Sequence, residues 1–211
     1  MANRIQQLYD TLLAHFGPQH WWPGDTPFEV MIGAVLTQNT NWLNVSRALD
    51  NLKAQGLLSF ERLESLPVES LAENIRPSGY YNQKAKRLKG LLAAIRADSG
   101  DLETFFAQDP ATLRDKLLQV KGIGPETADS ILLYAAEKQA FVVDAYTHRI
   151  LCRHNLIAEE SDYHEIQEVF VEALPAEIAT YNEYHALLVR LGKDYCKKTN
   201  PLCKTCPLAD F

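Results

Sequence analysis

The sequence predicts an all-α protein, and two observations lead to that prediction. Apolar residues recur at helical spacing along almost the whole chain of 211 residues, and no window shows the sustained two-residue alternation of a half-buried strand. Short Gly and Pro clusters separate the periodic segments, which indicates short connections. These clusters are Gly17-Pro18, Pro23-Gly24, Pro77-Ser78-Gly79 and Ser99-Gly100.

Five apolar stripes justify the predicted helices in chain order, because each repeats every three or four residues. The stripes are Ile5, Leu8, Leu12 and Phe16; Phe28, Met31, Val35 and Leu36; Leu88, Leu91, Leu92 and Ile95; Ile166, Val169, Phe170, Ala173 and Leu174; and Tyr184, Leu187, Leu188 and Leu191. Pro175 ends the fourth stripe, and Phe141-Val142-Val143 is too short to indicate a strand.

A tight turn at residues 120–129 joins two more predicted helices. Gly122 and Gly124 give the backbone freedom that side chains resist, and Pro125 suits the first turn of a helix. Backbone N–H groups in such a turn can bind a phosphate without reading sequence. The alternative is a plain connector with a glycine C-cap. Asp144 follows closely along the chain, so a phosphate site and a single acid together suggest chemistry on DNA.

Charge is unevenly distributed, although the net value of −6 alone argues against a nucleic-acid partner. Six basic residues and no acid lie between Arg76 and Arg96, and five basic residues lie between Arg190 and Lys204. Residues 157–183 carry eight acids and no Lys or Arg. Such segregation can steer a polyanion to one face, although each run can equally be a solvated helix face.

The chain resembles the helix-hairpin-helix DNA glycosylases of the endonuclease III superfamily, over essentially its whole length. The resemblance rests on the order and spacing of Leu36-Thr37-Gln38-Asn39-Thr40, residues 78–85, the hairpin, Asp144 and the cysteine-rich tail. It implies a two-lobed helical fold with the catalytic cleft between the lobes. Residues 20–136 would form a helical barrel domain, and residues 1–19 plus 137–211 would form a domain with the catalytic Asp and an iron–sulfur loop.

Glu126 is the main departure from the bifunctional members of that family. Those members carry a lysine two residues past the second glycine of the hairpin, and its amine forms a Schiff base with the sugar. A carboxylate cannot form an imine, so the resemblance implies base removal without strand cleavage by this route. Glu126 can shape or polarise the pocket, or its role can be purely structural.

Asp144 matches the catalytic aspartate of the family. Cleavage of a glycosidic bond builds positive charge on the sugar, and a nearby carboxylate can stabilise that charge and activate water. The alternative is an ordinary N-cap for the helix that begins near Tyr146.

Three tryptophans suggest the base that is removed. Trp21, Trp22 and Trp42, together with Glu126, resemble the 3-methyladenine branch of the family, in which stacked aromatic side chains hold the extruded base. Purines alkylated at N3 or N7 are cationic, so aromatic faces attract them and the base leaves without an added proton. The tryptophans can instead be core residues.

Several residues are predicted to contact DNA. Gln38 matches the glutamine that fills the gap left by the extruded base, and Tyr80 occupies the wedge position of its loop. Both can also be ordinary loop residues. The remaining predicted contacts are Lys84, Lys86, Arg87, Lys121, Gly122, Gly124 and Thr127.

The tail matches the family's iron–sulfur motif at three of its four cysteine positions, Cys196, Cys203 and Cys206. The pattern continues with a fourth cysteine, which would fall one residue beyond Phe211. We expect a 4Fe-4S cluster whose fourth ligand lies just beyond the sequence. The alternatives are a fourth ligand from Cys152, a zinc ion in place of the cluster, or no cluster at all. The resemblance also allows a monovalent cation at the hairpin.

The leading hypothesis is therefore a monofunctional glycosylase for alkylated purines in double-stranded DNA, acting as a cytoplasmic monomer without membrane attachment. One alternative keeps the scaffold but changes the base to an oxidised or mismatched pyrimidine. The other is a non-catalytic DNA-binding module.

Overall fold

A computed structural model describes residues 2–21 and 24–211. Within these residues the ordered elements are helices, no strand is present, and the all-α prediction is confirmed. Nowhere in these two ranges is a helix long and apolar enough to cross a membrane. Trp22, one of the predicted base-pocket residues, lies outside the described residues.

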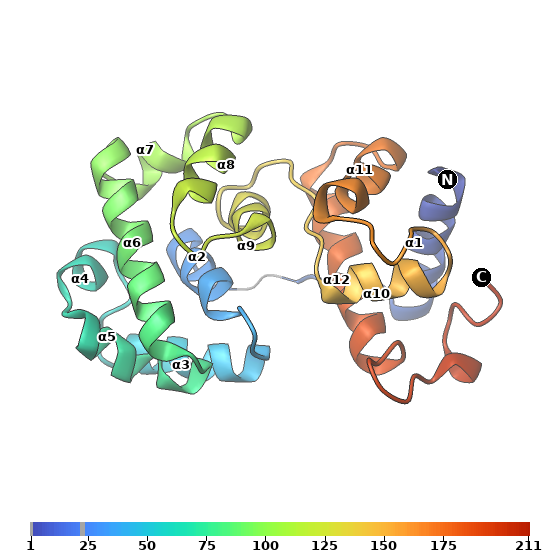
Figure 1. The fold of residues 1–211 in the computed structure, drawn as a ribbon, viewed down its shortest axis with the longest axis horizontal. Coiled ribbons are helices and arrows are strands. Elements are labelled where there is room, and N and C mark those ends of the chain that lie inside the picture. The colour runs from blue at the N-terminus through green and yellow to red at the C-terminus, as the bar shows by residue number, and fades with distance from the viewer. Residues whose placement is uncertain (1, 22–23) are drawn as a thin grey trace. The chain divides into compact units, whose positions relative to one another are not determined.

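The chain divides into two compact units (Figure 1). The first, called here the terminal unit, combines residues 1–21 with residues 139–211. The second, called the middle unit, covers residues 22–138.

The middle unit packs short helices against two longer ones. Its elements are α2 (Pro27–Leu36), α3 (Trp42–Ala54), α4 (Phe60–Ser65), α5 (Val68–Asn74), the 3-10 helix η1 (Arg76–Ser78), α6 (Tyr81–Ser99), α7 (Leu102–Phe106), α8 (Pro110–Gln119), α9 (Pro125–Ser130) and the π-helix η2 (Ile131–Ala135). The predicted stripes on α2 and α6 are buried, because both helices pack against several neighbours. Thr26 caps α2 by accepting a hydrogen bond from the Glu29 N–H.

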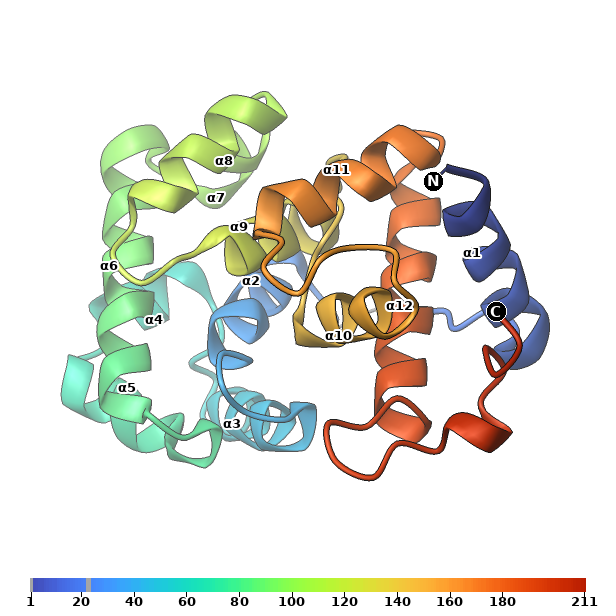
Figure 2. The same ribbon diagram turned by 45° about the vertical axis from the view of Figure 1, so that its right-hand side comes forward.

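The terminal unit is built on α12 (Ile178–Asp194). Figure 2 shows α12 between α1 (Ala2–Phe16) and α10 (Ala145–Arg153), and both helices contact it. The helix α11 (Tyr163–Ala173) packs on α1, and a short 3-10 helix, η3 (Cys203–Thr205), lies in the tail. The stripe on α12 is buried as predicted, whereas Phe16, Val169 and Ala173 at the edges of their stripes are half-buried.

Candidate active site

Asp144 is the N-cap of α10, and its two carboxylate oxygens have different partners. Oδ1 accepts hydrogen bonds from the Thr147 N–H at 2.8 Å and from the Thr147 hydroxyl at 2.9 Å. The side chain is 12% exposed. The capping role that competed with catalysis in the sequence is therefore present, but it occupies only Oδ1. Oδ2 is directed to a different neighbour.

His185 of α12 lies beside that second oxygen. Its Nε2 is 3.6 Å from Asp144 Oδ2, an ion pair when the imidazole is protonated. The Trp21 indole stacks on the same imidazole, with 5.6 Å between ring centroids and 12° between planes. Sequence reasoning missed His185. The available signal was a histidine within the apolar run of α12, between Tyr184 and Ala186.

The carboxyl of Asp144 is held in its charged form. Burial alone would raise its pKa, but His185 and the hydrogen bonds from Thr147 outweigh burial and hold the pKa below its ordinary value. Asp144 is thus ionised at neutral pH inside a largely enclosed environment. A carboxylate of this kind can stabilise an adjacent positive charge or accept a proton from water.

Gly192 sets how closely α10 approaches α12. A Cβ atom at this glycine would lie 2.2 Å from Cδ1 and 2.9 Å from Cβ of Tyr146. Tyr146 is in the first turn of α10, next to Asp144 along the chain. The missing side chain therefore allows the carboxylate on α10 and the imidazole on α12 to meet.

The predicted hairpin lies in the middle unit, between α8 and α9. Gly122 has φ +90°, a conformation that favours glycine, and Pro125 occupies the first turn of α9 as expected. Lys121 and Glu126 are exposed, whereas Thr127 is buried. The backbone thus has the form expected of a phosphate-binding turn, and Glu126 occupies its helical end.

Gln38 connects this hairpin to the turn after α2. Its Nε2 donates to the Gly122 carbonyl at 3.0 Å and to the Thr127 hydroxyl at 2.9 Å, while its Oε1 accepts from Arg87. Arg87 also packs on Gly122, because a Cβ there would lie 2.5 Å from its Nε. Four residues predicted to contact DNA therefore form one internal network in this structure.

A buried ion pair joins the two hairpin helices. Arg114 of α8 binds both carboxylate oxygens of Asp129 on α9, with Nε–Oδ1 at 2.6 Å and Nη2–Oδ2 at 3.1 Å. The Asp129 side chain is fully buried. Asp129 belongs to the hairpin motif, but sequence reasoning gave it no role.

Lys84 corrects a prediction. Its side chain is buried, and its Nζ donates to the Leu36 and Ser78 carbonyls, so it does not face a phosphate as predicted. Lys86 is exposed, and Tyr80 is 65% exposed with its backbone in the left-handed region at φ +46°. Tyr80 therefore has the exposure that a wedge requires.

The basic run from Arg76 to Arg96 does not form a continuous cationic surface. Its other members bind partners within the protein. Arg76 forms an exposed pair with Glu73, Lys89 donates to carbonyls at the end of α4, and Arg96 pairs with Glu64. In the tail, by contrast, Lys193, Lys197, Lys198 and Lys204 are exposed.

The two described tryptophans belong to different units. Trp21 stacks on His185 in the terminal unit, while Trp42 begins α3 in the middle unit and packs on Gly33. Both are half-buried.

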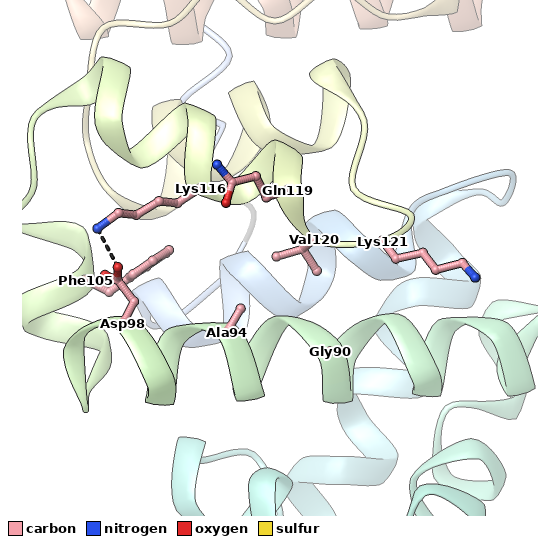
Figure 3. A pocket seen from close by; sticks show the side chains of 8 residues that line it. All are labelled: Gly90, Ala94, Asp98, Phe105, Lys116, Gln119, Val120 and Lys121. Carbon is pink, nitrogen blue, oxygen red and sulfur yellow. Dashed lines mark ion pairs between the residues drawn. The ribbon is translucent and has the colours of Figure 1, made fainter.

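A hollow of about 400 Å³ lies elsewhere in the middle unit (Figure 3). Gly90, Ala94 and Asp98 of α6 line one side, and the opposite side is formed by α7, α8 and the start of the hairpin turn. The Lys116–Asp98 ion pair, at 2.5 Å, crosses one end. Of the predicted site residues this hollow includes only Lys121, so it is separate from the candidate chemistry.

The cysteines of the tail supply three thiols of the kind that iron–sulfur clusters use. Cys196 is buried and its Sγ lies 3.3 Å from Nη1 of Arg153, whereas Cys203 is exposed and Cys206 is half-buried. Burial, together with the neighbouring Cys196 and Cys203, raises the pKa of the Cys206 thiol. In the described ranges, however, no three His, Cys, Asp or Glu side chains are placed to hold a metal ion. The donors fit a cluster in type and spacing but not in their present arrangement.

Comparison with known proteins places these features in a family context. Residues 32–176 match the family model described as "HhH-GPD superfamily base excision DNA repair protein". The chain is 46% identical over 209 residues to the putative DNA repair glycosylase MJ1434 of Methanocaldococcus jannaschii, covering 98% of this chain and 94% of that protein.

Two solved structures share the fold. The 3-methyladenine DNA glycosylase MagIII of H. pylori, bound to 1,N6-ethenoadenine, has a TM-score of 0.76 and 34% identity, covering 91% of this chain and 95% of MagIII. A trapped covalent intermediate of endonuclease III with DNA has a TM-score of 0.86 and 23% identity, covering 100% of this chain and 94% of that one.

Proposed function

The chain belongs to the HhH-GPD superfamily of base excision DNA repair proteins, and from this premise we propose that it is a monofunctional DNA glycosylase that removes alkylated purines of the 3-methyladenine type. The observation that carries the proposal is Asp144, a mostly buried carboxylate kept ionised by His185 and Thr147. The 34% identity to MagIII, described as a 3-methyladenine DNA glycosylase, supports the choice of base.

In the proposed reaction Asp144 acts on the sugar of an extruded nucleotide. The bond between the base nitrogen and the anomeric carbon breaks, and its electron pair leaves with the base. The carboxylate of Asp144 stabilises the positive charge that develops on the sugar and accepts a proton from the water that attacks the anomeric carbon. A cationic alkylated purine becomes neutral as it leaves, so the reaction requires no acid to protonate it.

Aromatic side chains are proposed to hold that base. A cation over an indole face gains roughly 1–2 kcal/mol when desolvated. Trp21 is already stacked on the ring beside the carboxylate, which would place the bound base close to the reacting atoms. We propose the same role for Trp22 and Trp42, as the sequence predicts.

The hairpin is proposed to hold a phosphate of double-stranded DNA through the backbone of residues 121–127, with Lys121 and Lys86 adding charge. Gln38 and Tyr80 are proposed to occupy the gap left by the base. For Gln38 and Arg87, this contact requires their present hydrogen bonds to be exchanged for bonds to DNA. Glu126, in the first turn of α9, is proposed to shape or polarise the pocket, as the sequence predicts.

A panel of duplexes, each with one lesion, tests the proposed function. Release of free 3-methyladenine from methylated DNA, with little release of oxidised or mismatched pyrimidines, is the expected result. Preferential release of a pyrimidine would move the assignment to an endonuclease III-like specificity. Binding without release from any duplex would support the non-catalytic alternative.

Borohydride trapping tests the absence of lyase chemistry. Because the hairpin carries Glu126 where an attacking amine would be needed, reduction during the reaction is expected to give no covalent complex with DNA. The variant Glu126→Lys serves as the comparison, since it places an amine at this position. A trapped adduct in the unmodified protein would show that another amine reaches the sugar.

We also propose that Cys196, Cys203 and Cys206 bind an iron–sulfur cluster. The thiol spacing and the Arg153 contact to the Cys196 sulfur support this, and no step of the reaction above depends on the cluster. Purified protein is expected to contain iron and sulfide and to absorb visible light. Cys203→Ser should lose that absorption and Cys152→Ser should keep it. Zinc without iron would contradict the proposal.

A further inference from the structure

Lys84 is the buried cation of the middle unit that the proposed reaction does not use. Its side chain is 1% exposed, and its Nζ donates to the Ser78 carbonyl at 2.6 Å and to the Leu36 carbonyl at 2.9 Å. Burial, and to a lesser extent the charge of Arg87, lowers its pKa to about 8. Burying an ammonium group costs free energy, so the buried position of Lys84 requires a structural explanation.

The two carbonyls stand at the starts of two separate turns. Leu36 is the last residue of α2, and its carbonyl is among those that a helix leaves without an internal partner. The turn with Gln38 begins directly after it. Ser78 is the last residue of η1, and Gly79 and Tyr80 follow directly. One ammonium group therefore joins segments that are far apart in the sequence.

Each of the two turns contains a residue whose backbone conformation is unfavourable for a side-chained residue. Asn39 has φ +55° and Tyr80 has φ +46°, and each is a side-chained residue in the left-handed region. Residues held in this way keep their conformation only when their surroundings fix it. Tyr80 receives little such support from its own side chain, which is 65% exposed.

We propose that Lys84 is a positioning residue that holds the Gln38 turn and the Tyr80 turn at a fixed separation, so that both side chains enter the duplex together when the damaged base leaves it. The inference rests on the proposed function and extends it to the extrusion step. Lys84 itself touches neither the base nor a phosphate.

Lys89 provides a matched control on the same helix. Its Nζ also donates to backbone carbonyls, those of Leu63 at 3.1 Å, Leu66 at 2.8 Å and Glu64. These carbonyls lie at the end of α4, and the turn there carries none of the proposed DNA contacts. Lys84→Met and Lys89→Met each remove an ammonium group and leave carbonyls without that donor.

Single-turnover base release from two substrates tests the role of Lys84. In one substrate the lesion is paired in a duplex; in the other it lies in a one-nucleotide bulge, where extrusion costs less. Lys84→Met is expected to slow release from the duplex by about tenfold or more and to slow release from the bulge much less. Lys89→Met should match the unmodified protein on both substrates.

Extrusion itself is measured with 2-aminopurine next to the lesion, whose fluorescence rises when the base leaves the stack. An unchanged rise in Lys84→Met, or an equal slowing on both substrates, would overturn the role given to Lys84. Failure of the unmodified protein to release any base would instead overturn the proposed function. If Lys84→Met does not fold, Lys84→Gln, which keeps an N–H₂ donor on a shorter chain, serves for the same comparison.

Discussion

Replacing Asp144 with asparagine is expected to abolish base release while leaving the fold and DNA binding intact. Asparagine caps helices as well as aspartate does, so the bonds from Thr147 to Oδ1 can persist. The charge at Oδ2 is lost, and with it the stabilisation of the sugar cation. We expect single-turnover release to fall by at least about 10²-fold, with the unfolding temperature and DNA affinity near those of the unmodified protein.

The pH dependence of the same reaction provides a second measurement. Because the pKa of Asp144 is lowered, release should persist above that low pKa and be lost only as pH falls through it. His185→Phe keeps a ring against Trp21 but removes the partner of Oδ2, so only the hydrogen bonds from Thr147 then oppose the effect of burial on the pKa of Asp144. The loss of base release on the acid side of its pH dependence should therefore occur at a higher pH. Full activity in Asp144→Asn, or an unchanged pH dependence in His185→Phe, would contradict the assignment.

Replacing Asp129 with alanine is expected to destabilise the hairpin strongly. The substitution leaves the Arg114 guanidinium, 22% exposed, without the carboxylate that binds it through two nitrogens. Breaking a buried pair from one side costs about 3–5 kcal/mol, measurable by urea unfolding. DNA affinity should fall as well, because the pair joins the two helices of the hairpin that is proposed to bind a phosphate.

The Lys116–Asp98 pair on the same helix α8 is the matched control. Its side chains are 34% and 27% exposed, so Asp98→Ala should reduce stability far less than Asp129→Ala. A double replacement of Arg114 and Asp129 by apolar residues should recover part of the loss, since no unpaired charge remains. Equal losses at the two pairs would contradict the importance given to the hairpin pair.

The parts predictable from sequence were those specified by local pattern. The stripe on α12 and the glycine spacing of the hairpin both follow from periodicity and backbone freedom, and the structure confirms them. The capping geometry of Asp144 was also foreseen as an alternative to catalysis. In the structure Asp144 caps α10 through Oδ1, while its Oδ2 lies beside His185.

The parts that could not be predicted depend on tertiary contacts. Lys84 was predicted to contact a phosphate because it lies just beyond the loop that carries Tyr80. The two carbonyls that its ammonium group binds explain why it is buried instead. His185 has no neighbour in sequence that indicates a partner, since Asp144 lies on another helix. The π-helix at Ile131–Ala135 likewise has no local signal.

The absence of a side chain at Gly192 sets the distance between α10 and α12. Any side chain at this position would have to displace the ring of Tyr146, and with it the N-terminal end of α10. Positions 146 and 192 should therefore change together among relatives, a bulkier residue at one being matched by a smaller residue at the other. A protein with bulky residues at both positions could still fold, yet its Asp144 carboxylate and His185 imidazole would no longer lie side by side.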